Sequence, residues 1–221
     1  MTSALPPDPT LDEIRAAAAP LLPRHAAFDG WRPAAVDGAA RDIGVDPAIA
    51  RLAFADGPAA MIDAWFASID DRMVQAHTSD ALAAMGVRAR ITALVECRLA
   101  LLERDREALR RALSILAMPA NIALSARLGW RAADAMWRLA GDTAADYNHY
   151  TKRAMLAAVY GATLMAFLND ESEGHAETRA FLARRIDGIM RFEKAKARLS
   201  ERRDRHFSMT RLIGRLRYPA V

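Results

Sequence analysis

The stretch GWRPAAVDGAARDIGVDPAIARLAF, residues 30–54, carries the pattern that decides the fold. Two short helical segments, residues 32–42 and 47–54, lie on either side of a glycine. Ala40 permits close packing of the two helices, and Gly44 permits the positive φ of a tight turn, which is the spacing of a helix-turn-helix. The sequence therefore predicts two short helices joined by a turn at Gly44.

Helical patterns extend from this stretch in both directions. The motif Thr10-x-x-Glu13 is a capping box, and it predicts a first helix that ends near Pro20 or Pro23. No segment alternates apolar and polar residues over the length of a strand, so we expect an all-α protein with about nine or ten helices. Apolar residues at helical spacing predict the later helices at residues 58–78, 86–103, 105–117, 119–140, 147–168 and 177–198.

The distribution of charge separates the last part of the chain from the rest. The chain has 221 residues, of which 52% are hydrophobic, and a net charge of +4. Residues 184–217 include twelve Lys or Arg and four Asp or Glu, a local charge of +8, so the remainder is acidic. This segment suits an anionic partner such as phospholipid, nucleic acid or an acidic protein surface. A solvated helix with long arginine side chains is the alternative.

Several classes of chemistry lack their motifs. Cys97 is the only cysteine, which excludes an intramolecular disulfide and a cysteine-based zinc site. The five histidines form no HxxxH, HExxH or ExxH pattern, and no GxSxG, P-loop or GxGxxG occurs. We therefore expect a binding protein with no catalytic residue, metal or cofactor. We also expect no secretory signal and no transmembrane span, because no apolar run reaches about 18 residues.

Residues 141–170, GDTAADYNHYTKRAMLAAVYGATLMAFLND, begin polar and aromatic and then lose every charge between positions 154 and 168. A helix that is apolar on every face must be surrounded by protein or by an apolar ligand. Its small residues include Ala157, Ala158 and Gly161, which allow either close helix packing or a tunnel. The sequence leaves these two alternatives open.

The layout of one helix, a helix-turn-helix and a larger helical domain resembles the TetR family of regulators. The candidate recognition helix, however, offers Arg51 as its one basic residue, beside Ile49, Leu52 and Phe54. Reading base edges requires several polar or basic side chains. We therefore expect the TetR-like fold without DNA binding, and we keep a ligand-responsive TetR-type repressor as the alternative.

The segment AGDTAADYNHYTKRAMLAAVYGAT…FLND, with LGWRAADAMWRLAGD before it and TRAFLARRIDGIM after it, closely resembles the lipid-binding accessory proteins of ubiquinone (coenzyme Q) biosynthesis. The resemblance is strong over residues 119–195. It implies a TetR-like homodimer that binds an isoprenoid quinone or phospholipid and no nucleic acid. It also implies that the protein presents the lipid to the di-iron demethoxyubiquinone hydroxylase without catalysing a reaction.

The resemblance implies a partner-binding patch around the AGD turn. His149 and Tyr150 match the aromatic pair of the family, which usually has Trp where this chain has His149. Trp130, Asp134 and Trp137 share one helical stripe and are expected to join the patch, although both tryptophans could instead pack within the bundle. The residues expected to bind lipid are Met155, Leu156, Val159, Tyr160, Leu164, Phe167, Leu94 and Phe181.

We expect three regions: a helix-turn-helix-like unit at residues 1–57, a lipid-binding and dimer domain at 58–200, and a basic amphipathic segment at 201–221. That last segment suits an interfacial helix on an anionic membrane, or alternatively a helix docked on its own domain or on a second copy. A location in the cytoplasm, peripheral on the inner face of the cytoplasmic membrane, is expected. The membrane-contact residues are then Met209, Arg211, Leu212, Ile213, Arg215 and Leu216.

Overall fold

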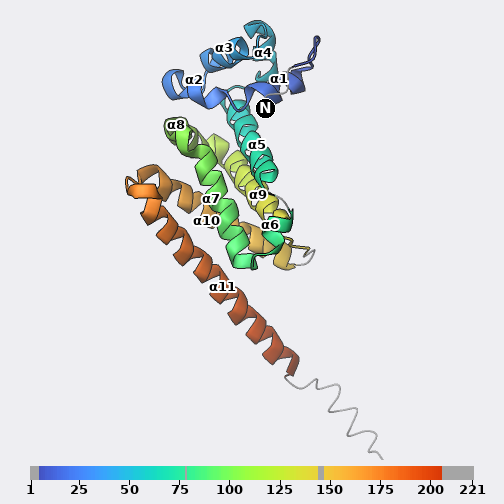
Figure 1. The fold of residues 1–221 in the computed structure, drawn as a ribbon, viewed down its shortest axis with the longest axis vertical. Coiled ribbons are helices and arrows are strands. Elements are labelled where there is room, and N and C mark those ends of the chain that lie inside the picture. Colours follow the sequence, from blue (N-terminus) through green and yellow to red (C-terminus); the bar gives the residue numbers. More distant parts are fainter. Residues whose placement is uncertain (1–4, 78, 144–146, 206–221) are drawn as a thin grey trace, which may run out of the picture.

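In a computed structural model, which describes residues 5–77, 79–143 and 147–205, the chain is all-α, and those residues contain no strand (Figure 1). The predicted fold class is confirmed. The α-helices in chain order are α1 (Leu11–Ala18), α2 (Leu22–Asp29), α3 (Pro33–Asp42), α4 (Pro47–Ala53), α5 (Pro58–Ala76), α6 (Ser79–Ala83), α7 (Val87–Leu102), α8 (Arg106–Leu116), α9 (Ile122–Leu139), α10 (Tyr147–Asn169) and α11 (Ala176–Arg205).

Two of these eleven helices were not predicted from the sequence pattern. Pro23 lies in the first turn of α2, where no backbone N–H is needed, so this proline begins a helix instead of ending one. Helix α6 has five residues, which is too short for a helical period to be recognised. The described part of the chain therefore has two more α-helices than were predicted for it, and α11 extends beyond its predicted end at residue 198.

Helices α1 to α4 form a small unit at one end of the molecule (Figure 1). The predicted capping box is present, since the Glu13 N–H donates to the Thr10 hydroxyl and the Thr10 N–H donates to the Glu13 carboxylate at 2.8 Å. Gly44 joins α3 to α4 with a φ of +72°, so the turn of the predicted helix-turn-helix is also present. Local sequence therefore determines both the start and the central turn of this unit.

Close packing holds the small unit together and joins it to the larger one. Gly38 of α3 lies against the ring of His25 on α2, and a Cβ at this position would lie 2.4 Å from His25 Nδ1. The indole N–H of Trp31 donates to the Ala108 carbonyl of α8 at 3.1 Å. Trp31 is itself buried beside Trp65 of α5, with ring centroids 5.2 Å apart. The two units therefore share one apolar core.

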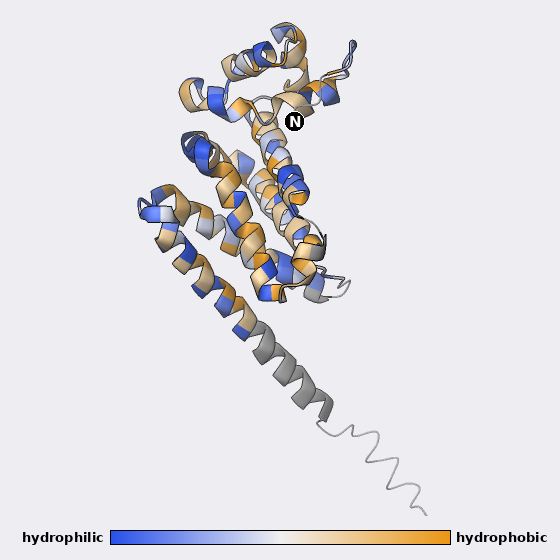
Figure 2. Ribbon diagram, viewed as in Figure 1, coloured by the Kyte–Doolittle hydropathy of each residue, from blue (hydrophilic) through white to orange (hydrophobic). Residues whose placement is uncertain are grey.

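The larger unit is built around α5, α7, α9 and α10. The apolar residues Met61, Trp65, Ile69 and Met73 recur at helical spacing along α5, and all four are buried. Helix α11 packs on α7 and α10 and then projects beyond the bundle (Figure 1). Along its described part α11 alternates hydrophobic and hydrophilic residues, as expected for a helix that packs with one face (Figure 2).

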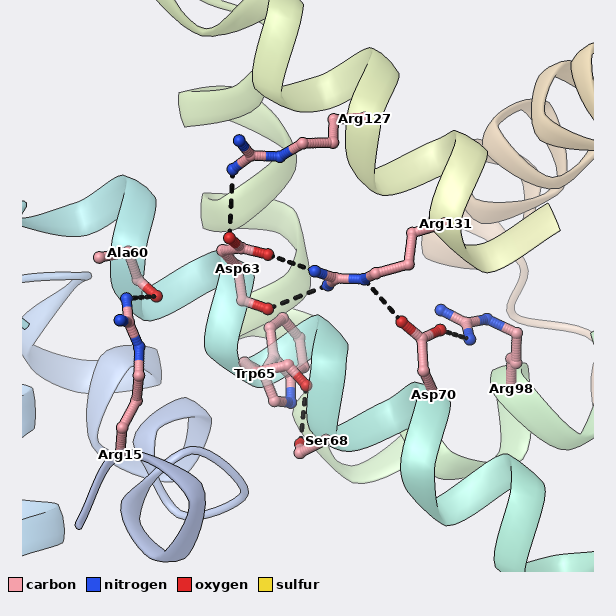
Figure 3. Close-up of polar contacts among 9 residues, drawn as sticks. All are labelled: Arg15, Ala60, Asp63, Trp65, Ser68, Asp70, Arg98, Arg127 and Arg131. Atoms are coloured by element: carbon pink, nitrogen blue, oxygen red, sulfur yellow. Dashed lines mark hydrogen bonds and ion pairs between the residues drawn. The ribbon is translucent and has the colours of Figure 1, made fainter. Parts of the chain in front are cut away.

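A chain of ion pairs links α5 to α7 and α9 (Figure 3). Asp70 of α5 pairs with Arg98 of α7 through one oxygen, and its other oxygen accepts from Arg131 Nε of α9 at 2.9 Å. Arg131 also pairs with Asp63, which lies about two turns before Asp70 on α5, and the two charged groups are 2.5 Å apart. Because the Arg98 side chain is fully buried, its positive charge must be compensated by the carboxylate of Asp70.

Asp170 organises the turn between α10 and α11. Its carboxylate accepts from the backbone N–H of Ser172 at 2.8 Å and of Thr178 at 2.7 Å, and from both hydroxyls. The hydrogen bonds from Ser172 and Thr178 hold the pKa of Asp170 well below its ordinary value. The ionised carboxylate therefore stabilises the start of α11.

Substitution Asp70→Ala is expected to lower the free energy of unfolding by about 3–5 kcal/mol, because it leaves the buried Arg98 charge without its partner. Glu107→Ala is the matched control: Glu107 pairs with Arg111 on the surface of α8 at 2.9 Å, and its loss is expected to cost less than about 1 kcal/mol. Urea unfolding followed by circular dichroism measures both. Equal, small losses would contradict a structural role for the buried pair.

The lowered pKa of Asp170 also predicts a pH dependence. A carboxyl group whose pKa is depressed by folding stabilises the protein above its unfolded value of about 3.9, and this contribution is lost as pH falls toward the folded value. Asp170→Asn is therefore expected to unfold at a lower temperature than the parent at pH 6, with the difference shrinking toward pH 3. Thermal unfolding from pH 3 to 7 tests this, and a difference that does not depend on pH would exclude the ionised cap.

Candidate functional site

The hairpin of α9 and α10 carries most of the residues expected in a functional site. Helix α9 ends at Leu139, and Gly141 turns the chain with a φ of +84°. Arg90 of α7 closes this turn, because its guanidinium donates to the Ala140 carbonyl at 2.8 Å and also to the carbonyl of Met85. The turn is therefore held from the side by α7.

Three aromatic rings gather where the beginning of α10 passes α9. Trp130 of α9 lies 6.0 Å from Tyr150 and 6.5 Å from His149, measured between ring centroids. His149 and Tyr150 meet edge to face at 5.1 Å. Tyr150 is 62% exposed, while the other two are half-buried. The structure thus brings together three of the five residues assigned to the patch, which we call the aromatic patch.

Charged residues beneath the aromatic patch fix its geometry. Arg153, which is buried, donates to Asp134 at 2.6 Å, to Asp142 at 3.0 Å and to the carbonyl of His149 at 3.2 Å. Lys152 donates to the other oxygen of Asp142 at 2.8 Å. Burial alone would raise the pKa of Asp142, but the hydrogen bonds from Lys152 and Arg153 lower it overall. Asp142 therefore stays ionised and holds the first turns of α10 in place.

Trp137 and Asp134 support the aromatic patch from inside the protein. Trp137 is buried, its N–H donates to the Lys152 carbonyl at 3.1 Å, and the Lys152 ammonium lies 5.3 Å from its ring centroid. Asp134 is paired with Arg153 and Arg138. Helical spacing predicts that Trp130, Asp134 and Trp137 share one stripe of α9. In the structure Trp130 and Asp134 are half-buried, whereas Trp137 is buried in the core. Trp137 therefore packs within the bundle, which was the alternative for both tryptophans.

A cavity of about 470 Å³ lies beside the later turns of α10. Its walls come from α5, α8, α9 and α10, and two of the eight expected lipid-binding residues, Tyr160 and Leu164, line it. Phe66, Leu113 and Leu128 line it as well, and none of them was predicted to bind lipid. Ala157, Ala158 and Gly161, the small residues of α10, also line this cavity. They are the feature of the sequence that indicated a cavity beside this helix.

The other expected lipid-binding residues lie elsewhere. Leu94, Leu156 and Phe167 are buried in the core, and Met155, Val159 and Phe181 are half-buried without lining the cavity. A helix repeats every 3.6 residues, so a run that is apolar all round sends only one face into any single cavity. The expected membrane-contact residues, at positions 209–216, lie outside the described residues.

Helix α10 also has an uncovered face. Among the residues that the structure describes, Met165 is 54% exposed, and Ala154, Ala158 and Ala162 are also exposed. Across the cavity mouth, Ile122 of α9 is 61% exposed. These residues form an apolar stripe that is exposed in the described part of the chain.

Helix α4 of the helix-turn-helix exposes mainly apolar side chains, which do not read base edges. Ile49 and Leu52 of α4 are 47% and 63% exposed. Arg51, the one basic residue of this helix, is paired with Asp37 of α3 at 2.7 Å, and this hydrogen bond lowers the pKa of Asp37. A cation that is already paired contributes less to binding phosphate.

In the ranges that the structure describes, no group of three or more His, Cys, Asp or Glu residues is placed to hold a metal ion. No single described helix is long and apolar enough to cross a membrane; one bent pair, Val87–Leu116 with Pro119–Leu139 at 95°, has the length and composition alone. The half-buried Cys97 has a pKa raised by burial, which favours the thiol over the thiolate.

Comparison with known proteins shows which proteins these features resemble. The COQ9 family model matches residues 122–193, which include α9, the aromatic patch and α10. The human "Ubiquinone biosynthesis protein COQ9, mitochondrial" is 33% identical over 184 residues, covering 80% of this chain and 56% of that protein. The rat protein of the same name is 43% identical over 96 residues, covering 43% of this chain and 31% of its own. The chain thus spans little more than half the length of the human relative.

Among solved structures, a TetR transcriptional regulator from Nitrosomonas europaea superposes with a TM-score of 0.62. It is 23% identical and covers 79% of this chain and 96% of its own, so the likeness concerns the fold alone. The chain is therefore related to the COQ9 proteins, whose family domain it carries at residues 122–193, and it has a TetR-like fold.

Proposed function

We propose that this protein is a non-enzymatic accessory protein of ubiquinone biosynthesis, which binds isoprenoid quinone intermediates and presents them to the di-iron demethoxyubiquinone hydroxylase. The names of its COQ9 relatives support a role in ubiquinone biosynthesis. Lipid binding and presentation to the hydroxylase are the finer part of the proposal, and they rest on the geometry of α10.

One observation carries this proposal: α10 joins the aromatic patch to the cavity. Tyr150 is exposed at the beginning of the helix, and Tyr160 lines the cavity ten residues later. At 1.5 Å per residue the two positions are about 15 Å apart along the axis. A partner bound at the patch would therefore lie close to a lipid held in the cavity.

The physical chemistry of polyprenyl lipids explains the need for such a protein. Each five-carbon unit gains about 4 kcal/mol on leaving water, at about 0.8 kcal/mol per carbon, so a long tail does not cross water to an enzyme unaided. A protein with an apolar cavity can shield part of the tail while a partner docks beside it. Exposed aromatic residues such as Tyr150 are common anchors of protein interfaces.

We further propose that the protein works as a homodimer at a membrane surface. The apolar stripe of α9 and α10 would be covered by a second copy, and two helices from each chain can form such an interface around a two-fold axis. The local charge of +8 over residues 184–217 supports attraction to anionic lipids on the inner face of the cytoplasmic membrane. The basic segment at residues 201–221 would make this contact.

The adaptor proposal predicts that Tyr150→Ala weakens binding to the hydroxylase about tenfold or more, as expected for an aromatic interface anchor. Phe28→Ala is the matched control, because Phe28 on α2 is an aromatic residue that is 85% exposed and far along the chain from the patch. Biolayer interferometry with the purified hydroxylase measures both affinities. If Tyr150→Ala binds as tightly as the parent, the patch is not the docking surface.

The dimer proposal predicts that Met165→Glu converts the protein to monomers, since a charge would be buried without a partner in the interface. Val74→Glu is the control, because Val74 of α5 is similarly exposed, at 48%, but lies outside the stripe. Size-exclusion chromatography with light scattering gives the masses. A parent protein that runs as a monomer, or a Met165→Glu variant that remains dimeric, would contradict the proposed interface.

A further inference from the structure

Arg90 of α7 is a half-buried cation that binds the backbone of two other segments. Its guanidinium donates to the carbonyls of Met85 at 2.8 Å, Ala83 at 3.0 Å and Ala140 at 2.8 Å. Ala83 is the last residue of α6, and Ala140 directly follows α9. Carbonyls at the end of a helix have no partner within it, and the helix dipole favours a cation there. Arg90 therefore joins the ends of α6 and α9 to α7.

The turn after α9 takes one donor from outside the hairpin. The Gly141 N–H donates to the Arg138 carbonyl at 3.0 Å. The Asp142 N–H donates to the Trp137 carbonyl at the same distance, and the two bonds together form the Schellman pattern of a helix end. Neither bond uses the Ala140 carbonyl, to which the guanidinium from α7 donates. A Cβ on Gly141 would lie 3.3 Å from that guanidinium, so the glycine also permits the close approach.

Asp142 connects the turn to the aromatic patch. Its side chain is 6% exposed, and its carboxylate accepts from Lys152 at 2.8 Å and from Arg153 at 3.0 Å. Arg153 also donates to the His149 carbonyl at 3.2 Å and to Asp134 of α9 at 2.6 Å. A displacement of the turn would therefore move Asp142 and, through Arg153, the backbone that carries the patch.

The aromatic patch needs such support because its rings come from two helices. Trp130 lies on α9, whereas His149 and Tyr150 lie on α10. Tyr150 is 62% exposed, so burial does not fix its position. A surface whose parts are ordered only on binding loses affinity to the entropy of ordering, whereas a surface fixed in advance does not. The geometry of the turn between the two helices therefore matters for docking.

We propose that Arg90 is a positioning residue of the docking surface: it fixes the turn between α9 and α10 from α7, and it thereby holds the aromatic patch in the arrangement that binds the hydroxylase. This inference rests on the proposed function and deepens it, because it names a group outside the patch that controls the patch. Arg90 acts through the Ala140 carbonyl, Asp142 and Arg153.

The test measures binding of the full chain to the purified hydroxylase by biolayer interferometry. Arg90→Met removes the donors and keeps an unbranched apolar side chain, and it is expected to lower the affinity about threefold to tenfold. The loss should appear as slower association, because only a fraction of the molecules then presents the patch in its binding arrangement. Tyr150→Ala should instead speed dissociation, as loss of a direct contact does.

Arg88→Met is the matched control. Arg88 lies two residues earlier on α7, its side chain is 56% exposed, and it pairs with Asp187 of α11 at 2.7 Å. The substitution removes the same charge without touching the turn, so binding is expected to be unchanged. An equal loss of affinity in Arg88→Met and Arg90→Met would show an effect of charge alone and would overturn the proposal.

A double-mutant cycle separates positioning from general loss of structure. If Arg90 acts through the patch, Arg90→Met combined with Tyr150→Ala loses less affinity than the product of the two single losses. Losses that multiply would make Arg90 independent of the patch, which contradicts the proposal. Arg90→Lys keeps the charge without the planar set of donors and should restore only part of the affinity. Thermal unfolding selects a temperature at which every variant is folded, and Arg90→Lys takes the place of Arg90→Met in the cycle if the latter does not fold.

The outcomes also distinguish this role from the adaptor function. If Arg90→Met binds the hydroxylase like the parent while Tyr150→Ala binds weakly, Arg90 has no positioning role and the adaptor function stands. If the parent does not bind the hydroxylase, the adaptor function is refuted, and the role of Arg90 with it.

Discussion

Asp70 joins three helices of the larger unit, because its two carboxylate oxygens are shared between Arg98 of α7 and Arg131 of α9. A buried arginine is tolerated only where an opposite charge compensates it. The pairing therefore fixes the relative positions of α5, α7 and α9, and Arg131 extends it to Asp63. The position of α10 follows, since Arg98 lies over the ring of Tyr160. One carboxylate thus connects the scaffold to the wall of the cavity.

Helix α10 combines two environments that rarely share one helix. Its first turns are held by the ion pairs of Arg153 with Asp134 and Asp142, and they present aromatic rings to solvent. Its later turns pack in the core, line a cavity and leave an apolar stripe uncovered. The polar half gives the aromatic patch a fixed shape, which lowers the entropic cost of docking. The apolar half supplies the surface that a lipid or a second chain would cover.

The small unit at residues 5–54 has the geometry of a helix-turn-helix. Gly44, the Thr10 capping box and the close approach of Gly38 to His25 maintain the turn and the helix packing. Ile49 and Leu52 are exposed on α4, and Arg51, which is also exposed, is paired with Asp37. Such a fold does not by itself establish DNA binding, because packing is decided by buried small residues and nucleic-acid binding by exposed polar ones.

Local sequence determined the helical class, most helix positions, the Gly44 turn and the capping box, because these depend on spacing, backbone conformation and nearby side chains. Helix α2 was missed since Pro23 looks like a helix end when its tertiary packing is unknown. The aromatic residues of the patch were identified through family resemblance, but the sequence did not show that Trp137 turns inward while Tyr150 remains exposed. The burial of Arg98 could have been inferred from the sequence, because Arg98 shares the apolar face of α7 with Leu94, Leu99 and Leu102.

Only the tertiary structure showed that Arg98 meets Asp70 and Tyr160, which lie 28 and 62 positions away in the sequence. It also showed that α5 and α8 supply walls of the cavity. A periodic pattern reports which face of a helix is apolar, but it does not report which other helix that face meets. Compensation of a buried charge and the shape of a cavity arise from contacts between distant segments, so packing decided them and sequence periodicity did not.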